Sequence, residues 1–174
     1  MEQTQKKKIS LNEVYPDIKD KIDNGGTVRL PITGISMRPL LVWGRDTVDL
    51  VKCKSPKKGD IIFYLRDNGQ FVLHRIVGTD ENGYILCGDN QWRLEYGIQD
   101  RHIIAVVTSI TRKGKTFDMT NVTYRIYSSL WMALLPFRKT IIPVVRKSKY
   151  RLKKIIVKLG LGKLFVKLGL INKI

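Results

Sequence analysis

Three polar positions in the first half of the chain combine residue types that can carry out nucleophilic hydrolysis. Ser36 lies in the segment Thr33-Gly-Ile-Ser-Met-Arg-Pro-Leu40, where glycine and proline predict a constrained loop that can present a hydroxyl to a substrate. His74 lies inside an apolar run, and Asp89 follows in a tight glycine turn. A serine hydroxyl needs a base to take its proton, and histidine is the side chain that suits this task near neutral pH. The set therefore indicates Ser-His-Asp hydrolysis if the fold brings the three together.

Each position taken alone has a simpler interpretation. Most loop serines such as Ser36 form turns and caps, a single strand histidine such as His74 is usually structural, and an acid after glycine often only completes a turn. The two cysteines, Cys53 and Cys87, are too few for a disulfide framework or a cysteine-rich metal site, and we expect two buried thiols. We therefore expect neither a metal ion nor a cofactor.

Four short segments in this order resemble the motifs of the type I signal peptidases. Gly34-Ile-Ser-Met-Arg-Pro-Leu40 resembles the nucleophile box, and Lys57-Lys-Gly-Asp-Ile-Ile-Phe63 resembles the strand that follows it. Val72-Leu-His-Arg-Ile-Val77 resembles the box that carries the base, and Gly88-Asp-Asn90 resembles the Gly-Asp-Asn motif of the family. The resemblance covers residues 27–110 and implies a signal-peptidase-like β-fold.

The resemblance also implies roles for individual residues. Ser36 would be the nucleophile and His74 the general base, as in the endoplasmic-reticulum and archaeal-type members, where most bacterial members have lysine. Asp89 would orient the base. In such members a second acid, an Asp, stands about six positions later; here Glu95 occupies that position and Asp100 lies further along, so we rank Asp89 above Asp100 and Glu95.

The loop around the nucleophile would also bind the oxyanion and the substrate. Its residues are Gly34, Ile35 and Met37, and the backbone N–H of Ser36 would stabilise the oxyanion, since Gly34 replaces the serine that assists in some members. The expected substrate is an extended peptide, such as a signal or leader segment of a preprotein, that adds as a strand beside the site.

The elements that must position these residues are mainly short strands. Ser10 and Glu13 predict a capping box, and apolar residues at helical spacing predict a helix over residues 11–23. Turns are expected at Asp67-Asn-Gly69 and at Asp80–Gly83. These patterns predict an antiparallel sheet or a partly closed barrel, with strands over residues 27–32, 46–52, 60–65, 71–77, 84–87 and 103–111.

Charge divides the chain into a nearly neutral part and a basic part. The sequence carries 32 Lys and Arg against 15 Asp and Glu, a net charge of +17, and no acid follows Asp118. We therefore expect three segments: an N-terminal extension with its helix (1–26), the catalytic β-domain (27–118) and a basic helical tail (119–174).

The tail combines positive charge with apolar residues. Within residues 124–174, one helical stripe is formed by Leu152, Ile155, Ile156 and Leu159, opposite Lys153, Lys154 and Lys158. The segment Ile155–Leu161 recurs in similar form at Leu164–Leu170. This pattern favours peripheral attachment to an anionic membrane surface, with the cytoplasmic face preferred, over docking on the chain's own domain or binding to nucleic acid. Prolines and charges interrupt the apolar run 127–145, which argues against a spanning helix.

Two other functions remain as alternatives. A self-cleaving repressor of the SOS type shares this β-fold, but it uses a lysine base where this chain has His74, and residues 1–26 are short for a DNA-binding domain. A non-catalytic module that binds membranes or nucleic acid would explain the tail but not the Ser36, His74 and Asp89 set.

Overall fold

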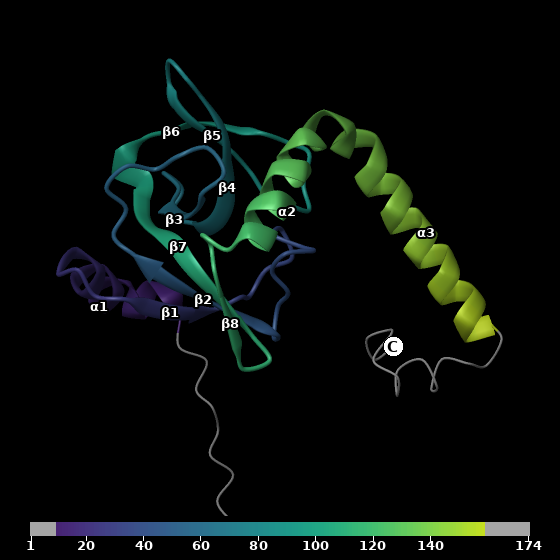
Figure 1. Ribbon diagram of the computed structural model, residues 1–174, viewed down its shortest axis with the longest axis horizontal. Coiled ribbons are helices and arrows are strands. Elements are labelled where there is room, and N and C mark those ends of the chain that lie inside the picture. The colour runs from purple at the N-terminus through teal and green to yellow at the C-terminus, as the bar shows by residue number, and fades with distance from the viewer. Residues whose placement is uncertain (1–9, 159–174) are drawn as a thin grey trace, which may run out of the picture. The chain divides into compact units, whose positions relative to one another are not determined.

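The structure, a computed structural model, describes residues 10–158 of the 174-residue chain (Figure 1). It is mainly β, with one helix before the strands and helices after them, as the sequence predicts. In chain order the elements are α1 Leu11–Asp23, β1 Val28–Pro31, β2 Asp46–Val51, β3 Ile61–Leu65, β4 Phe71–Asp80, β5 Gly83–Cys87, β6 Glu95–Ile98, the 3₁₀ helix η1 Asp100–His102, β7 Ile103–Arg112, β8 Lys115–Asp118, α2 Val122–Ala133, the 3₁₀ helix η2 Leu135–Phe137 and α3 Arg138–Lys158.

The strands form one antiparallel eight-stranded sheet. Its order is β1-β2-β7-β3-β4-β5-β6, and β8 pairs with β7 outside that path. Within the described residues β1 and β6 form the two ends and do not pair with each other, so the sheet is not closed. The predicted antiparallel sheet is therefore confirmed.

β3 is buried on both faces and separates two hydrophobic clusters. Ile61 and Phe63 join the first cluster, while Ile62 and Tyr64 join the second, because successive side chains of a strand point to opposite faces. Burial of each such isoleucine contributes about 1.5–3 kcal/mol relative to exposure. Two cores on a shared strand make β3 a rigid support for any residue that pairs with it.

Helix α1 covers the first cluster with Ile18 and Ile22, so the predicted helix is confirmed with its bounds. The hydroxyl of Ser10 accepts a hydrogen bond from the Asn12 N–H at 3.3 Å and caps the first turn. Pro16 lies inside the helix.

Both predicted hairpins are present, and two strands were missed. The turn between β3 and β4 ends at Gly69 (φ 79°), and the turn between β4 and β5 ends at Gly83 (φ 127°), conformations that favour glycine. β6 and β8 carry no apolar alternation that would predict them: β6 contains Gly97, and all four residues of β8 are exposed. Pairing with β5 and β7 makes them strands.

The chain divides into two compact units, residues 1–133 and 134–174. The expected boundary was at 118, but α2 makes side-chain hydrogen bonds with the strands and therefore belongs to the first unit. The tail is helical in α2 and α3, as predicted. The recurrent segment Leu164–Leu170 and the side chains of the predicted stripe lie outside the described residues. Across residues 10–158, no helix has the length and apolar character needed to cross a membrane.

Candidate active site

The loop that carries Ser36 joins β1 to β2 and is held by the turn after β5. The carbonyl of Ser36 accepts the Asn90 N–H at 2.6 Å, and the carbonyl of Ile35 accepts the Asn90 amide at 3.1 Å. Met37 is buried in the first hydrophobic cluster and anchors the other side of the loop. These contacts fix the backbone on both sides of Ser36.

The far end of the same loop is anchored by a buried carboxylate. Asp46 accepts hydrogen bonds from Arg45 at 2.7 Å, from Arg112 at 3.1 Å and from the Val42 N–H at 2.9 Å. Burial alone would raise the pKa of Asp46, but these donors outweigh burial and lower the pKa to about 2. The carboxylate therefore remains charged and holds the start of β2 in place.

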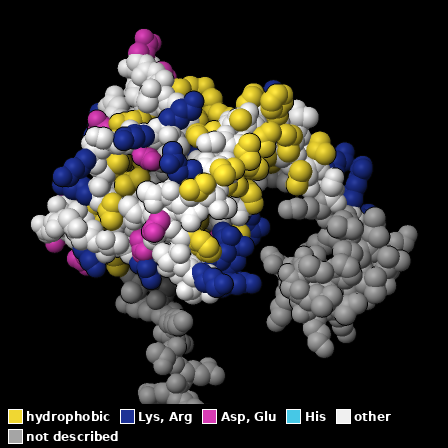
Figure 2. Space-filling model, viewed as in Figure 1, with side chains coloured by type: hydrophobic (Ala, Val, Ile, Leu, Met, Phe, Trp, Pro, Cys, Tyr) yellow, Lys and Arg dark blue, Asp and Glu magenta, His cyan; other side chains and the backbone are white. Residues whose placement is uncertain are grey.

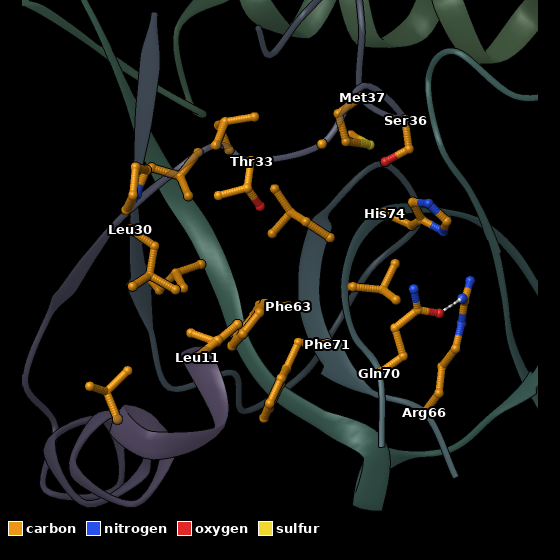
Figure 3. Close-up of a pocket in the computed structure, with 18 of the residues that line it drawn as sticks. Leu11, Leu30, Thr33, Ser36, Met37, Phe63, Arg66, Gln70, Phe71 and His74 are labelled. Carbon is orange, nitrogen blue, oxygen red and sulfur yellow. Dashed lines mark hydrogen bonds between the residues drawn. The ribbon is translucent and has the colours of Figure 1, made fainter. Parts of the chain in front are cut away.

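His74 is a buried residue of β4 that faces Ser36 across a groove. Its ring is 3 % exposed, and β4 pairs it with Ile62 of β3. Both side chains line one cavity, and Figure 3 shows Ser36 and the imidazole of His74 near each other at one end of it. The described structure contains no hydrogen bond between the two groups, which is common in ligand-free enzymes, where such bonds tighten when substrate binds.

Gly88 shows how closely the three segments of the site approach one another. A Cβ atom at Gly88 would lie 2.8 Å from the carbonyl oxygen of Ser36 and 3.1 Å from Nε2 of His74. Any side chain at this position would displace either the nucleophile loop or the base. Only glycine therefore fits at this position of the Gly-Asp-Asn turn. The same distances place Nε2 on the side of the ring that is nearest the loop of Ser36.

The other ring nitrogen of His74 faces Tyr64 and Glu95. Nδ1 lies 3.2 Å from the Tyr64 hydroxyl oxygen and 3.6 Å from Oε2 of Glu95, and the Tyr64 hydroxyl donates to that same oxygen at 2.7 Å. Since the tyrosine has one proton and gives it to Glu95, its oxygen can only accept from Nδ1. Nδ1 therefore carries a proton, and in the neutral form of the ring the free lone pair is on Nε2, on the side of Ser36.

Glu95 is held ionised in this arrangement. Arg66 donates two hydrogen bonds to its carboxylate, at 2.6 Å and 2.5 Å. Burial alone would raise the pKa of Glu95, but the nearby His74 ring and the hydrogen bonds from Arg66 and Tyr64 outweigh burial and hold the pKa well below its usual range. The pKa of Tyr64 is raised, first by burial and then by Glu95, so the phenol stays protonated as a donor. A negative charge therefore stands behind the imidazole.

Asp89 does not face the base but forms a buried ion pair with Arg75. Arg75 donates two hydrogen bonds to its carboxylate, at 2.9 Å and 2.8 Å, and both side chains are fully buried. The same guanidinium donates to the carbonyl of Gly59 at 3.0 Å and to the side-chain oxygens of Tyr124 and Ser128, both at 2.8 Å. Asp89 thus joins the turn after β5 to helix α2.

The geometry places Glu95, rather than the higher-ranked Asp89, beside His74. Glu95, ranked below Asp89, is the carboxylate nearest His74. Asp100 accepts a hydrogen bond from Tyr84 at 2.8 Å on the surface. The reason is that Arg75 neutralises Asp89, whereas β6, a strand that the sequence did not predict, places Glu95 beside the base.

Tyr64 and Arg66 are site residues that the sequence reasoning missed. The turn at Asp67–Gly69 fixes the register of β3 against β4, which pairs Ile62 with His74. Tyr64 follows two positions later on the same face and is therefore a diagonal neighbour of His74. Register analysis of this hairpin could have identified Tyr64, but Arg66 lies beyond β3 and gave no comparable signal.

The cavity that Ser36 and His74 share is a groove of about 880 Å³. Figure 3 shows Leu11, Phe63 and Phe71 away from the nucleophile, and the hydrogen bond from Arg66 to Gln70 (2.5 Å) beside the base. Its walls come from α1 and from β1 to β4, and most of its lining is apolar. Such a surface fits an extended peptide with apolar side chains better than a charged ligand.

In the part of the chain that the structure describes, no three His, Cys, Asp or Glu side chains come together as a metal site. Comparisons with known protein families, curated proteins and solved structures found no match for this chain. The arrangement of the site is therefore the basis for its functional interpretation.

Proposed function

We propose that this protein is a serine endopeptidase in which Ser36 is the nucleophile and His74 the general base. The observation that carries the proposal is the orientation of His74: Nδ1 is occupied by Tyr64 and Glu95, so Nε2 is available to the Ser36 hydroxyl. A hydroxyl, a neutral imidazole and an ionised carboxylate in this order form the working arrangement of serine hydrolases.

In this mechanism the Ser36 oxygen attacks the scissile carbonyl carbon while Nε2 of His74 takes the hydroxyl proton. The C–N bond then breaks as the imidazolium gives that proton to the departing amine, which leaves an ester on Ser36. Water, activated by the same nitrogen, hydrolyses the ester and restores the serine. Glu95 stabilises the imidazolium through its negative charge at 3.6 Å.

Backbone donors would stabilise the oxyanion, with the N–H of Ser36 as the first of them. The loop is rigid around this group because Asn90 binds the carbonyls of Ile35 and Ser36. A single well-placed donor contributes about 3 kcal/mol to stabilisation of the transition state. Gly34 also lines the groove and leaves room for substrate next to the nucleophile.

The proposed substrate is an extended peptide, and two unpaired strand edges support this. Within the described residues, β1 pairs only with β2, and β4 pairs with β5 only from Arg75 onward. The outer edge of β1 and the edge of residues 71–74 both border the groove and offer backbone hydrogen bonds to an added strand. The signal-peptidase-like order of the motifs makes a signal or leader segment the proposed substrate class.

The test is cleavage of a diverse library of unmodified peptides, with new termini identified by mass spectrometry. The wild-type protein should produce a consistent set of cuts, and the Ser36→Ala and His74→Ala variants should produce none. Ser55→Ala, which changes an exposed loop serine, is the matched control and should cut like wild type.

Two outcomes would overturn this proposal. Unchanged cleavage by a folded Ser36→Ala protein would exclude the serine mechanism. Cuts that occur only within the protein's own chain, and never in added peptides, would favour the self-cleaving alternative.

A further inference from the structure

Helix α2 presents a row of large apolar side chains to solvent. Val122, Ile126 and Leu130 are spaced four residues apart, so they lie along one face of the helix, and they are 70 %, 56 % and 62 % exposed. Figure 2 shows hydrophobic side chains gathered over the helices that follow the sheet. We call these three residues the outer face of α2.

The outer face is not explained by packing of the first unit. The opposite face of α2 makes the contacts with the strands: Tyr124 and Ser128 bind Arg75, while Trp131 donates to the carbonyl of Asp89 at 3.1 Å. The helix is thus fixed by its polar face, and its apolar face is left open to solvent. This is the reverse of a helix whose apolar face is buried to stabilise the fold.

The only charged residue of α2 is a cation, and the chain that follows the helix is basic. Arg125 is exposed on the same helix, α2 has no acid in its first turn, and the sequence contains no Asp or Glu after Asp118. The second unit also combines positive charge with exposed apolar side chains. Residues 134–174 contain twelve Lys and Arg and no acid. Its exposed apolar side chains are Phe137, Ile141, Val144 and Val145.

We infer that the outer face of α2 docks on the surface of an anionic lipid bilayer. Apolar side chains insert at the boundary between head groups and acyl chains, and the cations of residues 119–174 bind the acidic head groups. A second copy of this chain would bring together two segments that each contain 13 cations and no acid, which opposes docking. Nucleic acid would use the charge but not the apolar row.

Docking through α2 would also orient the candidate active site. The polar face of α2 binds Asp89, and the next residue, Asn90, binds the backbone of Ser36. The membrane-facing row and the nucleophile loop are therefore joined by a short chain of hydrogen bonds. The inference concerns binding alone and holds whether or not the protein is a peptidase.

The experiment is co-sedimentation of the full chain with vesicles of phosphatidylcholine, with and without phosphatidylglycerol. The protein should bind the anionic vesicles, bind neutral vesicles at least about tenfold more weakly, and dissociate in high salt. The double variant Ile126→Asp, Leu130→Asp should bind anionic vesicles at least about tenfold more weakly than wild type. Tyr96→Asp, on β6, makes the same kind of change at another exposed side chain and should bind like wild type.

A second variant keeps the inference testable if the acidic substitutions disturb folding. Ile126→Trp retains an apolar side chain, and tryptophan favours the membrane interface, so this variant should bind at least as tightly as wild type, with a blue shift in its fluorescence. Equal binding by a folded Ile126→Asp, Leu130→Asp protein would overturn the inference. A dimer in solution that this double variant abolishes, without vesicle binding by wild type, would overturn it as well.

Discussion

Glu95 and Asp89 are both carboxylates near the candidate base, but they have different cationic partners. The Glu95 carboxylate accepts two hydrogen bonds from Arg66 and also lies beside His74. The Asp89 carboxylate accepts hydrogen bonds from Arg75 on both of its oxygens. The first carboxylate can therefore stabilise an imidazolium, and the second can stabilise the fold. Substitution of each acid should separate these two effects.

The Glu95→Gln substitution should lower the catalytic rate more than it lowers stability. It removes the negative charge behind His74 and leaves the shape of the side chain unchanged, so we expect kcat to fall about 100-fold with little change in KM. Steady-state kinetics on a peptide identified by the library would measure this. A kcat close to that of wild type would remove Glu95 from the role of positioning residue.

The Asp89→Asn substitution should act on stability first. It leaves the buried Arg75 guanidinium without a charged partner, which costs about 3–5 kcal/mol in free energy of unfolding. Urea titration would measure the loss. Asp100→Asn, at an exposed carboxylate, is the control and should change stability by less than about 0.5 kcal/mol. A stable but inactive Asp89→Asn protein would instead restore Asp89 as the third member of a triad.

Among the elements, α2 and β6 contribute most to the site without providing a reacting group. β6 pairs with β5 and brings Glu95 beside the base, and α2 places hydroxyl and indole groups on the Arg75–Asp89 pair. Both elements lie outside the motifs that carry the chemistry. Removal of either element should therefore displace residues of the site without removing a proposed reacting group.

Shortening the chain at two points should show that α2 is part of the β-domain. A chain ending at Ala133 keeps the whole first unit and should unfold cooperatively with a stability close to that of the full protein. A chain ending at Asp118 loses the partners of Arg75 in α2, two hydrogen bonds to a charged group worth about 1.5–3 kcal/mol each. Thermal and urea unfolding would measure both. Equal stability of the two chains would show that α2 is dispensable.

For the whole molecule, charge is distributed unevenly along the chain. Residues 1–118 contain all 15 acids and 19 of the Lys and Arg, a net charge of +4, and the remaining 56 residues contain 13 cations. The acids of the first part are used in buried or half-buried pairs such as those of Asp46, Asp89 and Glu95. The stability of the first unit should therefore depend on pH through these carboxylates.

The buried carboxylate of Asp46 should make the first unit less stable as the pH falls. Its pKa falls from 3.8 to about 2 on folding, so its contribution of about 2 kcal/mol is present above pH 4 and is lost as the pH falls toward 2. Between pH 6 and pH 3, wild type should lose about 1 kcal/mol more stability than Asp46→Asn, which has no such proton to bind. Urea titrations at both pH values would measure this difference. Parallel losses in the two proteins would contradict it.

Local patterns determined much of the secondary structure and the two central site residues. Helical spacing and a cap predicted α1 with its bounds, and apolar runs separated by glycine turns predicted six strands and two hairpins. Residue chemistry singled out Ser36 and His74, which the fold places on one groove. These features depend on neighbours within a few residues, which is the range over which backbone propensity and side-chain alternation act.

Tertiary structure alone decided which acid lies beside His74 and where the first unit ends. Glu95 lies beside His74 because β5 pairs with β6 and because Tyr64 contacts both side chains, although Glu95 is 21 positions from His74 and 31 from Tyr64 in the chain. Asp89 forms an ion pair with Arg75, and Arg75 also donates a hydrogen bond to Ser128 of α2. Spacing cannot rank carboxylates that compete for distant cations, because the competition is settled by burial and packing after the strands have paired.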